Sequence, residues 1–246
     1  MSLEHTRRTY EEFGREDPLY AVLTTPEFRH GANEARFFET GREEIARVLA
    51  RVDVLAPGLA RASALDFGCG VGRLTQALAD HFGEAVGVDI ASSMVERARA
   101  CNRHGDRVRY VVNTVDDLRV FPSDSFDFVY SNISLQHSPP DAGKRYIAEF
   151  LRLLRPGGVA AFQVPNGPPI PATGLGAWWY RLRRQHVRRL WKRLRGKVAY
   201  EMHHIPRGEV EAILAAGGAT LLAADPVGHR PGRNFMYFAQ RPAAGS

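Results

Sequence analysis

From about Arg61 to residue 164 the chain alternates short apolar runs with longer mixed segments. Short apolar runs bounded by turn residues are typical of buried strands, and mixed segments with apolar residues three or four positions apart are typical of amphipathic helices. Repeated strand and helix units produce a mainly parallel sheet with helices on both faces. The alternation therefore predicts a doubly wound α/β fold.

Seven strands are predicted in all, and the last two are joined by a short connection. These two strands are expected to form an antiparallel hairpin at one end of the otherwise parallel sheet. The predicted strands are Ala62–Phe67, Ala85–Asp89, Val108–Val112, Phe126–Ser131, Val159–Val164, Ala219–Ala224 and Asn234–Gln240.

The predicted helices lie between these strands. One ends at about Phe82, and the others cover Ser92–Cys101, Asp141–Leu154 and Pro206–Ala216. Pro156-Gly157-Gly158 is expected to stop the third of them.

The 246 residues are enough for one sizeable core and few for two independent domains. Residues 1–56 are helical in pattern and precede the first strand, so we expect an N-terminal helical cap. Residues 57–246 then form the main domain, which carries a helical insert or lid at residues 165–205.

The stretch from Leu65 to Arg73 places three alternating glycines, Gly68, Gly70 and Gly72, between a predicted strand and a predicted helix. Glycine accepts positive φ and lets a ligand approach the backbone closely. In open α/β sheets, ligands bind at the carboxyl ends of strands near a topological switch point. This loop is therefore the strongest candidate for a cofactor site.

Two common cofactor loops do not fit this sequence. The dinucleotide pattern G-x-G-x-x-G fails because its sixth position is Arg73 when read from Gly68 and Thr75 when read from Gly70. A phosphate-binding P-loop fails because no Gly-Lys-Ser/Thr follows. The carboxylate of Asp66 would also repel a pyrophosphate, whereas it would attract an ammonium group.

A second acid, Asp89, ends the second predicted strand, 19 residues after Gly70. A carboxylate there can accept hydrogen bonds from ribose hydroxyls. It can also serve as an acid favoured at a helix N-terminus, and the two roles are compatible.

The run from Asp66 to Arg73 resembles the first motif of class I S-adenosylmethionine-dependent methyltransferases, and Asp89 matches their ribose-binding acid. The stretch Ser125–Ser131 is similar to the family's fourth motif. The resemblance covers roughly residues 61–164 and resumes at Pro206. It implies S-adenosylmethionine as cofactor and S-adenosylhomocysteine as product.

Within this resemblance, Asp89 would hold the ribose, Ile90 would pack on the adenine, and Val115 and Asp116 would flank the adenine edge. The methionine part would lie among Asp66, Gly68, Cys69, Gly70, Gly72 and Ser131.

One position departs from the family pattern. Relatives often carry Gly-Asp-Ala-Glu-Asp-Leu after the third strand, and the first Asp reaches the adenine amine. Here Thr114 takes that Asp position, so the contact is either weaker or supplied by Asp116.

His137, just past the fourth strand, is the first candidate for a catalytic base, because its ordinary pKa suits proton transfer. A loop histidine that only packs or forms hydrogen bonds is the competing interpretation. His204, beside His203 and close to Glu201, is the second candidate. No metal is expected, since adjacent histidines point in different directions and no third ligand lies at a useful spacing.

The net charge of +6 comes from one segment, because nine basic residues and no acidic one lie between Arg181 and Lys197. Apolar residues at helical spacing from Leu175 to Leu194 indicate an amphipathic helix. It is interpreted as a lid over the acceptor, as a site for an anionic acceptor or partner, or as a helix on an anionic membrane surface. Nucleic acid is the least favoured partner, since no recognition motif accompanies the charge.

The function expected from these patterns is methyl transfer from S-adenosylmethionine to a small-molecule or saccharide-like acceptor, at oxygen. The alternatives are a non-catalytic S-adenosylmethionine-binding protein and a peripheral membrane protein that docks through the basic helix at residues 175–195. The absence of an N-terminal apolar stretch and the two cysteines favour a cytoplasmic protein.

Overall fold

A computed structural model describes residues 2–167, 202–228 and 234–243. The predicted basic helix at residues 175–195, and with it most of the predicted insert, lies outside the described residues. None of the helices in the described ranges is long and apolar enough to cross a membrane.

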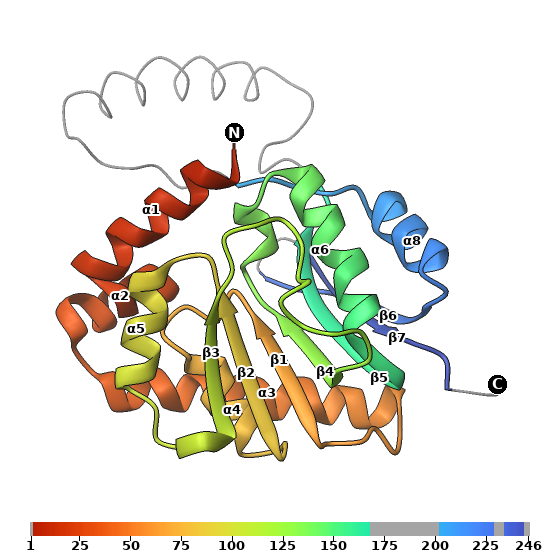
Figure 1. The fold of residues 1–246 in the computed structure, drawn as a ribbon, viewed down its shortest axis with the longest axis horizontal. Coiled ribbons are helices and arrows are strands. Elements are labelled where there is room, and N and C mark those ends of the chain that lie inside the picture. The colour runs from red at the N-terminus through yellow and green to blue at the C-terminus, as the bar shows by residue number, and fades with distance from the viewer. Residues whose placement is uncertain (1, 168–201, 229–233, 244–246) are drawn as a thin grey trace.

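One sheet of seven strands runs through the molecule in the order β3-β2-β1-β4-β5-β7-β6 (Figure 1). The first five strands pair in parallel, and β7 is antiparallel to both β5 and β6. The predicted sheet, mostly parallel with an antiparallel terminal hairpin, is therefore confirmed. The strands are β1 (Ser63–Phe67), β2 (Glu84–Asp89), β3 (Val108–Val112), β4 (Phe126–Ser131), β5 (Leu154–Pro165), β6 (Thr220–Pro226) and β7 (Asn234–Gln240).

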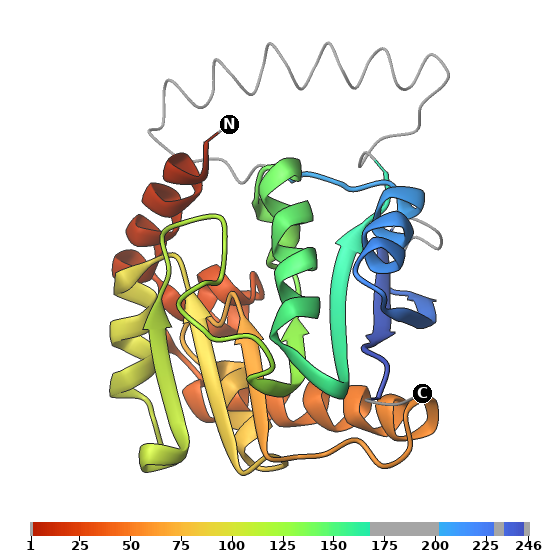
Figure 2. The ribbon, with the colours of Figure 1, turned by 45° about the vertical axis from the view of Figure 1, so that its right-hand side comes forward.

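Helices cover both faces of the sheet (Figures 1 and 2). On one face lie α3 (Glu34–Leu55), α4 (Arg73–Ala79) and α5 (Ser92–Ala100); on the other lie α6 (Pro140–Leu153) and α8 (Arg207–Ala216). Each layer of helices packs against one face of the sheet and forms an apolar core with it, because the strands supply apolar side chains to both faces.

Further helical elements lie near the N-terminus and between the strands. At the N-terminus these are α1 (Leu3–Glu16), α2 (Pro18–Val22) and the 3-10 segment η1 (Pro26–Gly31). The short 3-10 turn η3 (Leu135–His137) leads into α6. Another 3-10 turn, η2 (Gly105–Arg107), precedes β3.

Helix α3 belongs to the layer of helices behind the sheet. It buries Ile45, Leu49 and Val52 in the same core as α4, in keeping with the three-to-four-residue spacing of these side chains. Its last residue, Leu55, lies next to the predicted boundary at residue 56, and the domain division itself stays a prediction.

Strand β5 begins five residues earlier than predicted, and Leu154 belongs to it rather than to the preceding helix. Phe126 pairs with Leu154, but Phe128 already pairs with Val159, so the residues between them form an irregularity in the ladder. Gly157 has a φ of +82°, and its N–H bonds to the carbonyl of Arg241. Helix α6 thus ends at Leu153, ahead of the Pro-Gly-Gly sequence, and that sequence lies in the irregular part of the next strand.

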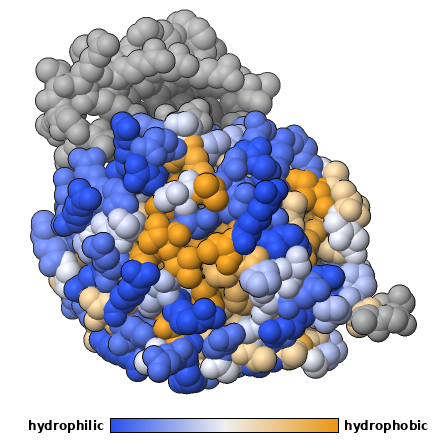
Figure 3. Space-filling model, in the orientation of Figure 1, coloured by the Kyte–Doolittle hydropathy of each residue, from blue (hydrophilic) through white to orange (hydrophobic). Residues whose placement is uncertain are grey.

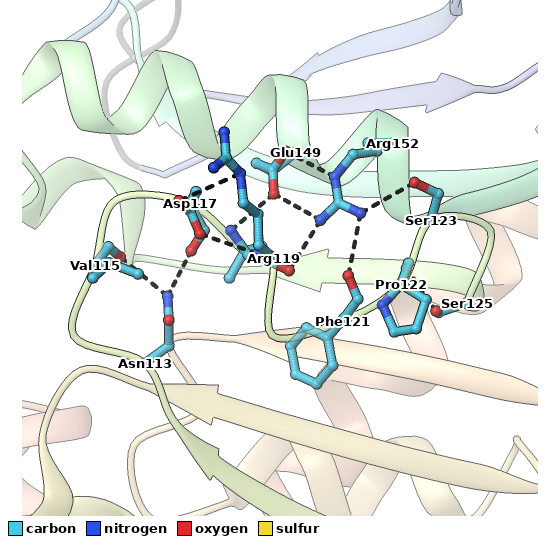
Figure 4. A network of polar contacts seen from close by, with 11 residues as sticks. Asn113, Val115, Asp117, Arg119, Phe121, Pro122, Ser123, Ser125, Glu149 and Arg152 are labelled. Atoms are coloured by element: carbon cyan, nitrogen blue, oxygen red, sulfur yellow. Dashed lines mark hydrogen bonds and ion pairs between the residues drawn. The ribbon is translucent and has the colours of Figure 1, made fainter.

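No helix follows β3; residues 113–125 instead cross the face that α6 covers. Two residues of α6 hold this connection (Figure 4). Glu149 accepts from the Leu118 N–H at 2.8 Å, and Arg152 donates to the carbonyls of Leu118 and Phe121 at 3.0 and 3.2 Å. Apolar side chains gather in the middle of this face (Figure 3).

Candidate functional site

The glycine loop between β1 and α4 is shaped by positive φ and by close neighbours. Gly68 and Gly70 have φ of +74° and +53°. A Cβ on Gly68 would lie 1.8 Å from Ser134 Oγ, and one on Gly70 would lie 2.8 Å from a methyl group of Val22. Because only glycine fits both the angles and the space, the backbone itself faces the region between β1 and β4. The sheet order reverses there, which is where open α/β sheets bind ligands.

Asp89 ties this loop to the end of β2. One carboxylate oxygen accepts from the Gly70 N–H at 2.8 Å and the other accepts from the Ala91 N–H at 2.9 Å. Burial raises the pKa of Asp89. Each oxygen has a second lone pair, so the carboxylate can accept further hydrogen bonds from a ligand.

A cavity with about 820 Å³ of empty space, its open mouth included, lies over this loop. Polar and apolar groups both line it, as is usual for ligand pockets. Five of the predicted site residues line it: Gly68, Gly70, Asp89, Ile90 and His137.

The other predicted residues of the methionine end lie behind the cavity wall. Asp66 is 1% exposed and accepts from Thr75 Oγ1 at 2.6 Å, and burial raises its pKa to about 7. Its second carboxylate oxygen and the hydroxyl of Ser131 are buried without a hydrogen-bond partner among the described residues. Such orphaned polar atoms fit a polar ligand group nearby. Burial also raises the pKa of the Cys69 thiol, which fits a small buried residue better than a nucleophile.

Gly72 is not part of the cavity lining in the described structure. It precedes α4 as its N-cap with a φ of +82°. A Cβ there would lie 2.2 Å from the Tyr110 hydroxyl, so close packing against β3 accounts for this glycine.

At the predicted adenine edge the structure brings a different residue to the cavity. Val115 is 51% exposed, and Asp116 forms an ion pair with Arg145 of α6. Neither is part of the lining, whereas Asn113 is. Sequence reasoning missed Asn113. Its position directly after β3 was the available signal, because the carboxyl ends of neighbouring parallel strands meet at one edge of the sheet.

The side chain of Asn113 is held in one orientation (Figure 4). Its Nδ2 donates to the carbonyls of Val115 and Asp117 at 3.1 and 2.7 Å. Both amide hydrogens are thus engaged, and the carboxamide oxygen is left as an acceptor. Its backbone N–H also bonds to the carbonyl of Asp89 at 2.9 Å, which places it beside the predicted ribose acid.

His137 lies at the end of η3 and lines the cavity. Thr6 Oγ1 donates to its carbonyl at 3.1 Å, and the ring of Tyr10 meets its imidazole edge-on at 5.7 Å between centroids. Its Nε2 lies 3.1 Å from Gln136 Nε2. His204 is half-buried and not part of the lining. The structure therefore brings only the first candidate base to the cavity.

The N-terminal helices supply one wall of the cavity. Tyr10 of α1 lines it, whereas Phe28, Phe37 and Phe38 are buried in an apolar cluster. Further lining residues that sequence reasoning missed are Leu3, Thr6, Ala21, Val22, Phe67, Val88, Met94, Asn132, Ile133, Ser134, Ser138 and Tyr146.

The arrangement suits a nucleoside with a charged amino-acid tail better than a metal or a phosphate. The glycine backbone, an acid at the end of β2, apolar Ile90 and Met94, and the Asn113 carboxamide meet in one cavity. Within residues 2–167, 202–228 and 234–243, no three His, Cys, Asp or Glu side chains are grouped to hold a metal.

Residues 64–158 match the family model described as "Methyltransferase domain". We call residues 64–158 the methyltransferase domain after this model. It contains the glycine loop, Asp89, Asn113 and His137, while α1 and the segment from residue 202 onward lie outside it.

Curated relatives of this methyltransferase domain act on different molecules. The chain is 36% identical over 128 residues to trans-aconitate 2-methyltransferase of Deinococcus radiodurans, which covers 52% of this chain and 46% of the relative. It is 34% identical over 109 residues to the ubiquinone biosynthesis O-methyltransferase of Methylococcus capsulatus, covering 44% and 45%. The chain thus spans about half the length of the curated relatives it matches.

The fold as a whole matches solved structures. Magnesium protoporphyrin IX methyltransferase of Synechocystis PCC 6803, solved with bound SAH (S-adenosylhomocysteine), superimposes with a TM-score of 0.64 at 18% identity. The match covers 97% of this chain and 99% of that chain. The same enzyme was also solved with bound SAM (S-adenosylmethionine). The seven-stranded sheet and its helices are therefore the fold of class I S-adenosylmethionine-dependent methyltransferases.

Proposed function

We propose that this protein transfers a methyl group from S-adenosylmethionine to a small-molecule acceptor. The observation that carries the proposal is the pairing of a glycine backbone with the Asp89 carboxylate, at the switch point between β1 and β4 and facing one cavity. The methyltransferase domain at residues 64–158 supports it independently.

The residues present fit the parts of the cofactor. Asp89 accepts from the ribose hydroxyls with its remaining lone pairs, and Ile90 and Met94 offer apolar contact to the base. The carboxamide oxygen of Asn113 accepts a hydrogen bond at the edge of the base. At the other end, the backbone of residues 68–70 lies against the methionine part.

Asp66 and Ser131 complete the methionine end of the proposed site from behind the glycine loop. Each carries a buried oxygen with no hydrogen-bond partner among the described residues. An ammonium group near Asp66 would favour its ionised form and so offset the burial that raises its pKa.

When bound, S-adenosylmethionine supplies an electrophilic methyl group on its sulfonium. The protein then has to position the acceptor, exclude water and accept a proton if the acceptor is a hydroxyl. His137 is the proposed base, because its imidazole borders the cavity and Thr6 and Tyr10 fix its backbone and ring. His204 stays the second candidate.

We infer a hydroxyl-bearing acceptor, either an apolar small molecule or a saccharide-like one, methylated at oxygen. Among the described residues that line the cavity there is no lysine or arginine, whereas Leu3, Tyr10, Val22 and Ile133 are apolar or aromatic. Such a lining favours an acceptor whose reacting end carries no charge. The relatives named for ubiquinone biosynthesis O-methylation support oxygen as the acceptor atom.

Calorimetric titration of the purified protein with S-adenosylmethionine and, separately, with NAD tests the proposal. We expect micromolar binding of S-adenosylmethionine, about −8 kcal/mol, and no binding of NAD. NAD binding alone would overturn the assignment of the glycine loop. Binding of S-adenosylmethionine without transfer of its labelled methyl group to any hydroxylated acceptor would favour a binding protein over an enzyme.

A further inference from the structure

The carboxylate of Glu11 in α1 bonds to the start of α5, the helix that brings Met94 to the cavity lining. Glu11 accepts hydrogen bonds from the N–H groups of Ser92 and Ser93 at 2.6 and 3.2 Å and from the Ser92 hydroxyl at 3.0 Å. Ser93 Oγ in turn donates to the Glu11 carbonyl at 3.0 Å. The Glu11 side chain is 13% exposed. Although burial opposes it, these hydrogen bonds lower the pKa of Glu11, so the group is charged at neutral pH.

The serines that Glu11 contacts are the first two residues of α5. Free N–H groups and the helix dipole favour a negative charge at that end, so Glu11 caps α5 from another element. The two helices lie side by side (Figures 1 and 2). A Cβ on Gly14 would lie 2.3 Å from Ser93 Oγ, which shows how closely they pack. Glu11 thus anchors α1 to the helix that follows Asp89.

Residues nearer the start of α1 reach the other wall. Thr6 Oγ1 bonds to the carbonyl of His137, and Tyr10 packs on its ring. Leu3, Thr6 and Tyr10 line the cavity together with Asp89 and the glycine loop. A ligand held by Asp89 would therefore lie in a cavity that α1 covers, from α5 on one side to η3 on the other.

We propose that α1 is a lid over the cofactor site and that Glu11 is the latch whose release from α5 lets the nucleoside ligand enter and leave. The proposal rests on the proposed function. Because Glu11, Ser92 and Ser93 lie outside the cavity lining, the latch can form equally with and without a bound ligand, so its strength should cancel from the affinity. It should instead set both rates.

Stopped-flow binding of S-adenosylhomocysteine to native protein, Glu11→Gln and Glu12→Gln tests the latch. Glutamine keeps the size of the side chain and removes the charge, and Glu12 is the exposed neighbour on the same helix. In Glu11→Gln we expect association and dissociation rate constants to rise together by about tenfold, with the dissociation constant changed by less than about threefold. Glu12→Gln should match native protein.

Two outcomes overturn the latch. Rates equal to those of Glu12→Gln would show that Glu11 does not control passage. Faster dissociation with unchanged association would show that Glu11 only stabilises the bound site.

If native protein binds no S-adenosylhomocysteine at all, the proposed function fails separately. Hydrogen exchange of the ligand-free variants then decides the latch. Exchange of α1 amides faster in Glu11→Gln than in Glu12→Gln, with α6 unchanged, supports it, and equal exchange overturns it.

Discussion

At the scale of single residues, the site depends on a few groups with fixed surroundings. Asp89 is the clearest case, because its two oxygens already hold the glycine loop and the start of α5 through Gly70 and Ala91. Its role is therefore both structural and, in the proposed function, ligand-binding. Replacing Asp89 should therefore weaken ligand binding in two ways, by removing a direct contact and by releasing the glycine loop.

We expect Asp89→Ala to weaken S-adenosylmethionine binding by about 2–3 kcal/mol, because it removes a charged acceptor and leaves the N–H groups of Gly70 and Ala91 without a partner. Calorimetric titration measures the loss. Asp116→Ala is the matched control, since Asp116 pairs with Arg145 away from the cavity. Equal affinities of the two variants would remove Asp89 from the site.

Asp66 predicts a pH dependence of stability. Burial raises its pKa to about 7, so the folded protein keeps a proton that the unfolded chain loses near pH 4. Folding is therefore disfavoured as the pH rises from about 4 to about 7, and the loss is complete above that range. Because asparagine does not ionise, Asp66→Asn should remove this pH-dependent loss of stability.

Urea unfolding at about pH 5 and about pH 8 measures the effect of Asp66→Asn. From about pH 5 to about pH 8, the unfolding free energy of native protein should fall by about 1–3 kcal/mol more than that of the variant. Comparing two pH values removes the pH-independent cost of the amide itself. If variant and native protein differ in unfolding free energy by the same amount at both pH values, then Asp66 is ionised in the folded protein at both.

At the scale of elements, α6 supports the connection that carries Asn113. The link between β3 and β4 has no helix of its own, and Glu149 and Arg152 bond its backbone directly (Figure 4). Arg152, in turn, holds the Glu149 carboxylate and lowers its pKa. Tyr146, on the same helix, donates to the Val115 carbonyl at 2.7 Å.

Arg152→Met should destabilise the fold by about 1–3 kcal/mol, since it leaves the carbonyls of Leu118 and Phe121 without this donor and removes the partner of Glu149. Urea unfolding measures the change. Arg119→Met serves as control, because the Arg119 side chain is 85% exposed. Equal stabilities of the two variants would contradict a supporting role for Arg152.

At the scale of the whole molecule, the cavity joins the N-terminal helices to the methyltransferase domain. Glu44 of α3 adds a second connection: it accepts from Tyr130 at 2.9 Å and from Asn132 at 2.6 Å, and pairs with Arg73 at 2.7 Å. Segments on both sides of the cavity are thus coupled through buried polar contacts. A ligand in the cavity should stabilise the entire fold.

We expect S-adenosylhomocysteine at about 100 times its dissociation constant to raise the unfolding free energy by about 2.7 kcal/mol, because it binds only the folded chain. Thermal unfolding across a concentration series measures this as a rising midpoint. Asp89→Ala should need correspondingly more ligand for the same rise. A midpoint that does not move with ligand would contradict the proposed cofactor.

Local patterns predicted the elements well. Short apolar runs marked all seven strands. The signal is strongest in β1 and β4, which are buried along their whole length and therefore need apolar residues on both faces. The predicted start of β5 was wrong. Locally, Pro156-Gly157-Gly158 indicates a helix stop, but Leu154 ahead of it pairs with Phe126, and Gly157 and Gly158 bond to Arg241.

Local sequence patterns were enough to predict the sheet and to place the glycine loop and Asp89 at one edge of it, because the ends of successive parallel strands meet at one edge whatever the rest of the chain does. Tertiary structure decided that Asn113 rather than Asp116 lines the cavity, since the competing partner Arg145 is 29 residues away. It also decided that α1 roofs the site, through contacts of Glu11 and Thr6 across 81 and 131 residues. Such contacts depend on how packed elements meet, which no local spacing encodes.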